Sequence, residues 1–128
     1  MKNNWLKFML AAAGTLFFVS GSALAHHGQA NYDTKNVVTV VGSVTEFQFV
    51  NPHCIVYFDV KNDKGQMEKW QGELTSPNRL VRSGWNQKSI KPGDKVTVTG
   101  WRAAGGANSM WVTKLIANGE ELALGGGD

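Results

Sequence analysis

The sequence predicts a mainly β domain: a small OB-like barrel of five to six strands with one short helix between strands three and four. Runs rich in β-branched and aromatic residues alternate with turn residues from position 37 to 124. After the third of these runs, the pair Ser76-Pro77 begins a short helical pattern. Two more runs and a terminal hairpin follow, which completes the element order of an OB-type barrel. A six-stranded barrel or sandwich without this order is the alternative.

The first predicted strand covers residues 37–50, and its apolar residues change parity. Val40 and Val44 occupy even positions, whereas Phe47 and Phe49 occupy odd ones. A strand with one buried face changes parity only through a bulge or a bend. We expect this bend to start at Gly42.

The second predicted strand, residues 53–60, alternates strictly. Cys54, Val56 and Phe58 share one face, which we assign to the core, and His53 lies on the opposite face. The turn at 61–66 leads into a third strand at 67–74, with Trp70 inward. A lone cysteine on the apolar face predicts a buried structural thiol.

The predicted helix begins with Ser76 as N-cap and Pro77 in its first turn, and it ends near Gly84. Its apolar stripe is expected to contain Leu80, Val81 and Trp85. Strands are then predicted at 95–101, 110–117 and 120–124, with a glycine-rich loop at 102–109. Asn118-Gly119 indicates a tight hairpin. Residues 125–128 are expected to be disordered.

The N-terminal 25 residues have the three parts of a secretory signal peptide. Lys2 and Lys7 precede an apolar run at 8–19, and small residues occupy positions 23 and 25. This run is too short to cross a hydrocarbon layer of roughly 30 Å. We expect cleavage after Ala25, a periplasmic or secreted location, and an N-terminal arm at 26–36 before a barrel domain at 37–124. Cleavage after Ala23 and a retained membrane anchor are the alternatives.

The charge balance argues against a nucleic-acid partner. Two of the 13 basic residues lie in the signal, which leaves 11 basic against 10 acidic residues and a net charge of +1. A nearly neutral domain lacks the basic footprint of a nucleic-acid-binding protein. After signal removal no transmembrane segment is expected.

Three histidines form the candidate metal site: His26, His27 and His53. Cleavage after Ala25 would give His26 a free α-amine beside its imidazole, and the two nitrogens would form a chelate ring. Such nitrogen-rich sites favour Cu(II) among the common divalent ions. Alternatively, the paired histidines are only the polar start of an arm, and His53 only forms a hydrogen bond.

Three aromatic residues, Tyr57, Trp101 and Trp111, are candidates for a ligand-binding face, with core packing as the alternative. Trp101 and Trp111 flank the glycine-rich loop and are expected to be the more exposed. No catalytic motif is present. We therefore expect a binding module and no enzyme. The alternative is a structural or interaction protein that holds a protein or glycan partner through the barrel face.

Several short motifs together resemble a known group of proteins. They are Ala25-His26-His27, Asn51-Pro52-His53, Trp70 followed by Glu73, Ser76-Pro77-Asn78, Gly84-Trp85 and Lys91-Pro92-Gly93-Asp94. This combination resembles the bacterial domain-of-unknown-function family 6152 of small exported proteins. The resemblance implies an OB-like barrel and groups His26, His27 and His53 with Glu73 as an auxiliary residue. It implies no activity, and the chain departs from the family pattern at residues 101–110.

Overall fold

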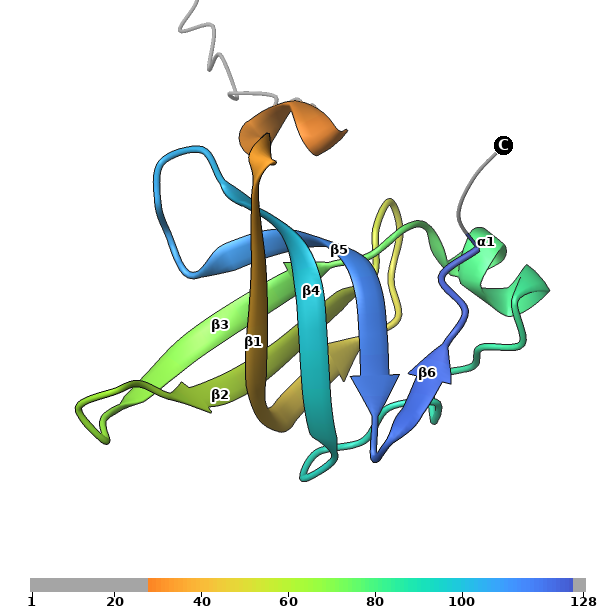
Figure 1. The fold of residues 1–128 in the computed structure, drawn as a ribbon. Coiled ribbons are helices and arrows are strands. Elements are labelled where there is room, and N and C mark those ends of the chain that lie inside the picture. The colour runs from red at the N-terminus through yellow and green to blue at the C-terminus, as the bar shows by residue number, and fades with distance from the viewer. Residues whose placement is uncertain (1–27, 126–128) are drawn as a thin grey trace, which may run out of the picture.

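The structure is a computed structural model that describes residues 28–125 (Figure 1). A 3-10 turn, Gly28–Asn31, precedes the strands β1 (Tyr32–Gln48), β2 (Ile55–Lys61) and β3 (Met67–Glu73), the helix α1 (Pro77–Arg82), and the strands β4 (Lys95–Ala103), β5 (Ser109–Ala117) and β6 (Glu120–Leu122). The predicted signal peptide at 1–25, His26, His27 and the last three residues of the predicted tail lie outside the described residues.

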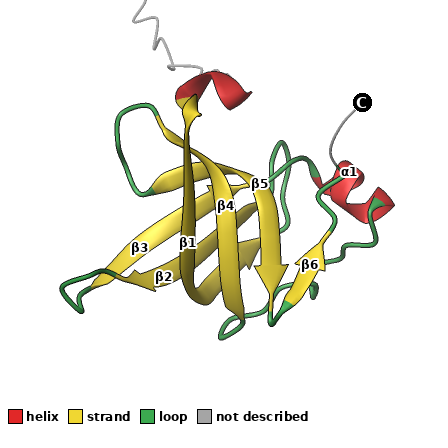
Figure 2. Cartoon of the chain, in the orientation of Figure 1, coloured by secondary structure: helices red, strands yellow, loops and turns green. Residues whose placement is uncertain are grey.

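The strands form one six-stranded sheet in the order β3-β2-β1-β4-β5-β6 (Figure 2). A further parallel pairing joins β3 to β5 through Gln71↔Ser109, Gly72↔Met110 and Glu73↔Trp111. This pairing closes the sheet into a barrel, and α1 lies between β3 and β4 in the chain. The predicted OB-like barrel with its short helix is therefore confirmed.

The parity change in β1 is confirmed, but its position differs from the prediction. In the pairing with β2, Val44 lies opposite Phe58 and Glu46 lies opposite Tyr57, so the extra residue of the bulge is Thr45. Gly42 lies instead at a close approach of two strands. A Cβ atom at Gly42 would lie 2.4 Å from the backbone oxygen of Asp59, so glycine allows the close crossing of β1 and β2.

The first strand begins five residues earlier than predicted, at Tyr32 and not at residue 37. Tyr32 pairs with Ala103 of β4, and the register then shifts before the next pair, Val37 with Trp101. Residues 32–36, which we expected to belong to the arm, are thus part of β1. Their polar sequence gives no local strand signal, and of these residues only Tyr32 pairs with β4, a long-range contact that local propensity does not report.

The core is made of the inward residues of all five long strands together with α1 and the segment after it. Its fully buried side chains are Cys54, Val56, Phe58, Leu74, Leu80, Ile90, Val96, Val98, Met110 and Leu115. The predicted alternation in the second strand is confirmed, as are the inward orientation of Trp70 and the burial of the Cys54 thiol. Burial raises the pKa of that thiol, which makes it a poor nucleophile.

The helix caps are also as predicted. The Ser76 side chain accepts a hydrogen bond from the Arg79 amide, Pro77 lies in the first turn, and Gly84 follows the helix with φ +92°. Trp85 packs against Phe47 with ring centroids 5.8 Å apart. Its indole nitrogen donates to the Ala123 oxygen at 2.6 Å, which ties the end of the chain to the barrel.

The prediction that Val81 belongs to the buried apolar stripe of the helix is wrong. Val81 is 55% exposed, whereas Leu80 is fully buried. The helix has only six residues, so it buries one narrow face, and adjacent positions point about 100° apart around its axis.

The terminal hairpin forms at Asn118-Gly119, where both residues have positive φ, +50° and +85°. These angles fit the mirror-image turn that matches strand twist. The last strand ends at Leu122, two residues before the predicted end. Across residues 28–125, no helix is long and apolar enough to span a membrane.

Candidate functional site

The site is built around the carboxylate of Glu73. Its Oε1 atom lies 2.6 Å from Nδ1 of His53, and its Oε2 atom accepts a hydrogen bond from the Tyr32 hydroxyl. Three segments far apart in the chain thus meet at one carboxylate: the start of β1, the residues just before β2, and the end of β3.

The closure of the barrel explains why these residues meet. Glu73 is the last residue of β3, where it pairs with Ile55 of β2 on one side and with Trp111 of β5 on the other. Its neighbours Gly72 and Leu74 are buried, so strand alternation turns Glu73 outward. His53 precedes the fully buried Cys54 and also points outward, as predicted from the alternation.

Trp111 packs against the rings of both residues that bind Glu73. The ring of His53 meets it edge to face, with centroids 5.2 Å apart and an interplanar angle of 85°. Tyr32 packs against the same indole at 6.2 Å and 56°. Rings at these separations attract each other beyond the area that they bury. Trp111 therefore fixes the ring planes of both Glu73 partners.

The hydrogen bonds determine how His53 is presented. The side chains of His53 and Glu73 are 24% and 18% exposed, so the pair is partly shielded from solvent. An ionised carboxylate only accepts hydrogen bonds, so a neutral His53 ring carries its proton on Nδ1 and donates it to Glu73. The Nε2 atom then keeps its lone pair. Among the described residues, Nε2 has no hydrogen-bond partner.

A polar chain continues from this pair along the seam between β3 and β5. The Ser109 side chain lies beside the Tyr32 hydroxyl, and Gln71 Nε2 donates to Ser109 at 3.3 Å. Gln71 and Ser109 also border a groove of ≈ 460 Å³, whose other lining residues are Tyr57, Lys69, Trp70, Ala107 and Asn108. The groove thus borders the polar residues that lie beside the site.

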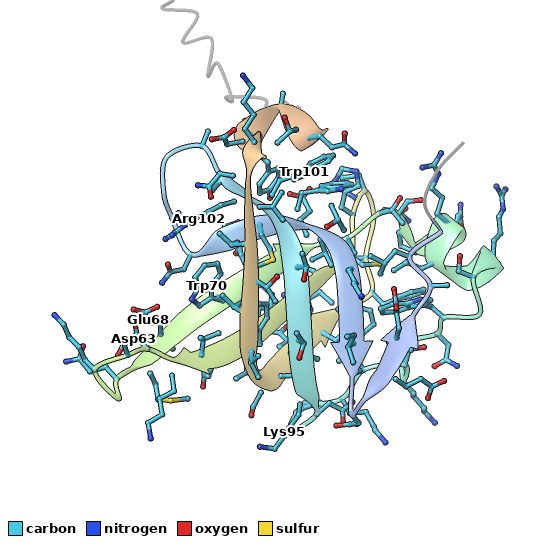
Figure 3. The ribbon with its side chains drawn as sticks, viewed as in Figure 1. Asp63, Glu68, Trp70, Lys95, Trp101 and Arg102 are labelled. Carbon is cyan, nitrogen blue, oxygen red and sulfur yellow. The ribbon has the colours of Figure 1, made fainter. Side chains whose placement is uncertain are left out.

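Arg102 organises the loop that borders this groove. Its guanidinium carbon lies 5.3 Å from the ring centre of Trp70, a cation–π contact (Figure 3). The same side chain donates to the Gly106 and Ala107 oxygens and to Asn108 Oδ1. The predicted glycine-rich loop is therefore held in one shape by an arginine at the end of β4.

The structure brings together only part of the predicted site. His53, Glu73 and Trp111 are in contact through the interactions above, while Tyr57 lines the groove. Trp101 is the cross-strand neighbour of Trp111. Both tryptophans are partly buried, and they are more exposed than the buried Trp70 and Trp85, as predicted. Trp111 contacts His53 and Tyr32. A ligand-binding face at these residues stays a prediction.

Sequence reasoning missed Tyr32 and Ser109. Tyr32 is the only large aromatic residue in the polar segment at 26–36, and that isolation is the signal that could have marked it as an anchor. Within residues 28–125, no three histidine, cysteine, aspartate or glutamate side chains are close enough to form a metal cluster. His26 and His27 lie outside the described residues.

Burial, reinforced by the hydrogen bond to Glu73, raises the pKa of Tyr32 to about 12. Because the raised pKa favours the protonated phenol in the folded state, its contribution to stability is complete below pH 10 and is lost as the pH rises towards 12. We expect a phenolate absorbance titration to show a component with a midpoint near 12 that Tyr32→Phe removes. Loss of a component with the ordinary tyrosine midpoint would contradict the contact with Glu73.

Comparisons with known proteins place the chain in a family without assigning an activity. Among solved structures, the mitochondrial single-stranded DNA binding protein Rim1 from S. cerevisiae is similar at 13% identity and a TM-score of 0.49, over 64% of this chain and 92% of that one. The N-terminal domain of PriB from Thermoanaerobacter tencongensis gives 20% and 0.40, over 65% and 96%. Both TM-scores are too low to bear on function.

No curated protein matches the sequence. A family model described as a family of unknown function, DUF6152, matches residues 14–110. This match spans most of the sequence, and the chain belongs to that family.

Proposed function

We propose that this chain is an exported binding module whose central ligand-binding group is the Nε2 atom of His53, and that its ligand is a transition-metal ion such as Cu(II). One observation carries the proposal: the Glu73 carboxylate holds His53 through Nδ1. Histidines that bind metals usually donate their other ring N–H to a carboxylate or carbonyl in this way.

The arrangement supports ligand binding for two reasons. The carboxylate accepts the Nδ1 proton and so favours the neutral tautomer that leaves Nε2 free. Tyr32 donates to the second Glu73 oxygen, and its raised pKa of about 12 keeps it a donor at neutral pH. Glu73 is thus held from one side by Tyr32 while it orients His53 on the other.

The remaining ligands would come from His26 and His27. His27 precedes Tyr32 by five positions, so their Cα atoms are at most about 18 Å apart at roughly 3.6 Å per residue. Since Tyr32 itself touches Glu73, a tether of this length would allow the two histidines to reach His53. The free amine of His26 requires export and cleavage after Ala25. The proposal therefore includes a periplasmic or secreted location.

The test is a Cu(II) titration of untagged protein whose processing after Ala25 has been checked by intact mass. We expect a visible absorption band at one equivalent of copper, because amine and imidazole nitrogens bind Cu(II) strongly. The band should be lost in His53→Ala and in a variant with three extra residues before His26, which move the free amine away from both imidazoles. Three extra residues at the C-terminus are the matched control and should change nothing. An unchanged band in both test variants would contradict the proposal.

The groove supports a second candidate, an interaction protein that holds a glycan or an extended protein segment. Its lining combines the Tyr57 ring with the polar side chains of Gln71, Asn108 and Ser109, a combination suited to hydrogen-bonded ligands with apolar faces. Removing His26 and His27 separates the two candidates. Metal binding would be lost, whereas capture of a partner through the groove would survive.

A further inference from the structure

One edge of β1 lacks a strand partner. β1 pairs with β4 from Val37 to Ser43, and it pairs with β2 only from Ser43 to Gln48. Within residues 28–125, the edge opposite β4 is therefore open from residue 37 to residue 42 (Figure 1). An open edge presents a row of unpaired backbone N–H and C=O groups, which are ready to bind another strand.

The side chains along this edge are apolar and unprotected. Val37 and Val41 are 56% and 63% exposed, and Thr39 between them is also exposed. Residues 36–42 contain no charge and no proline, the two devices that usually protect strand edges from association. Such a segment, with high β-propensity and no charge, is expected to be covered by another strand.

We propose that a second copy of this chain covers this edge, through an antiparallel pairing of the two β1 strands about a two-fold axis at Thr39. The five residues Val37-Val38-Thr39-Val40-Val41 read the same in both directions. Antiparallel pairing about Thr39 therefore places Val37 opposite Val41 of the second copy, Val38 opposite Val40, and threonine opposite threonine. Pairs of β-branched residues and threonine pairs stabilise neighbouring strands.

The flanking residues also suit this register. Asn36 would lie opposite Gly42, where the open edge ends, so no like charges face each other. Val38 and Val40 already pack against the core of their own barrel, which fixes the outward direction of Val37 and Val41. The two-fold axis makes the interface isologous, the type found in most homodimers. The pairing would join the β1–β4 sheets of two barrels into one.

The test uses the molar mass in solution and three variants of the full chain. We expect the wild-type protein to be a dimer at micromolar concentration. The double variant Val37→Lys with Val41→Lys places like charges opposite each other twice and should raise the dimer Kd by roughly 100-fold or more. The variant Val37→Glu with Val41→Lys places opposite charges there in the same register and should remain dimeric. Val81→Lys, at an equally exposed valine of α1, is the matched control and should also remain dimeric.

The variant Val37→Glu with Val41→Lys controls for loss of folding, because both double variants alter the same two exposed side chains. Thermal unfolding followed by circular dichroism checks that each variant is folded. A monomeric wild-type protein would overturn the proposal, and would leave the open edge to the chain's own N-terminal segment or to another protein. A dimer that persists with lysine at both positions would also overturn it, since the interface would then lie elsewhere.

Discussion

Replacing Glu73 by glutamine is expected to weaken Cu(II) binding about 10- to 100-fold, the usual effect of losing a carboxylate that orients a metal-binding histidine. Glu73 accepts one hydrogen bond at each oxygen, from Tyr32 and from His53. A glutamine amide has one acceptor oxygen and one donor nitrogen, so its oxygen can replace only one of the two carboxylate acceptors.

The partner that faces the new N–H group of the glutamine can no longer donate its hydrogen bond there. If it is His53, the ring has to accept at Nδ1 and carry its proton on Nε2, which removes the lone pair that would bind the metal. If it is Tyr32, the phenol loses its acceptor, and the carboxamide holds His53 without a charge. A copper titration measures the effect, and Glu46→Gln, at an exposed carboxylate of β1, is the control. Equal affinities of the two variants would show that Glu73 does not orient a ligand.

Replacing Gly100 by alanine is expected to lower the free energy of unfolding by about 3 kcal/mol, at the upper end of the usual cost of overpacking. A Cβ atom at Gly100 would lie 2.1 Å from the backbone oxygen of Trp111 and 3.1 Å from the sulfur of Met110. The carbonyl belongs to the neighbouring strand β5, so it can move only if the β4–β5 pairing opens. The register between these strands already shifts next to Gly100.

Gly105→Ala is the matched control, because a Cβ atom there would have no neighbour within 4 Å. We expect its unfolding free energy to stay within about 0.5 kcal/mol of wild type, as for most surface substitutions. Urea denaturation measures both variants. Similar stabilities would show that β4 and β5 approach each other less closely at Gly100 than the structure indicates. Because Trp111 supports His53, Gly100→Ala should also weaken copper binding.

Local patterns predicted the parts of the fold that depend on local physics. The alternation from His53 to Val60 was sufficient to assign the core face and the outward direction of His53, because side chains in a strand alternate strictly. The parity change between Val44 and Phe47 was sufficient to require a bulge, although not to place it at Thr45. The serine–proline start of α1 was similarly informative, since capping is a local interaction.

The contacts that make the site are not local, and no local pattern pairs these residues. Tyr32 and Glu73 are 41 positions apart, and His53 and Glu73 are 20 apart. Glu73 entered the prediction only through the family resemblance. Trp111 joins the site because β3 and β5 pair in parallel, and this pairing depends on the closure of the whole barrel. The start of β1 at Tyr32 depends on another long-range pairing, with Ala103 of β4.

The position of ring protons in His53 tests the central claim most directly, and nitrogen-15 NMR of the imidazole reports it. At a pH where the ring is neutral, we predict that His53 carries its proton on Nδ1 in the wild-type protein, because Glu73 accepts it. In Glu73→Gln the population should shift towards the Nε2–H form, and His53→Gln should assign the signals. A wild-type His53 that already carries its proton on Nε2 would contradict the account, because no lone pair would then be available at the proposed ligand-binding atom.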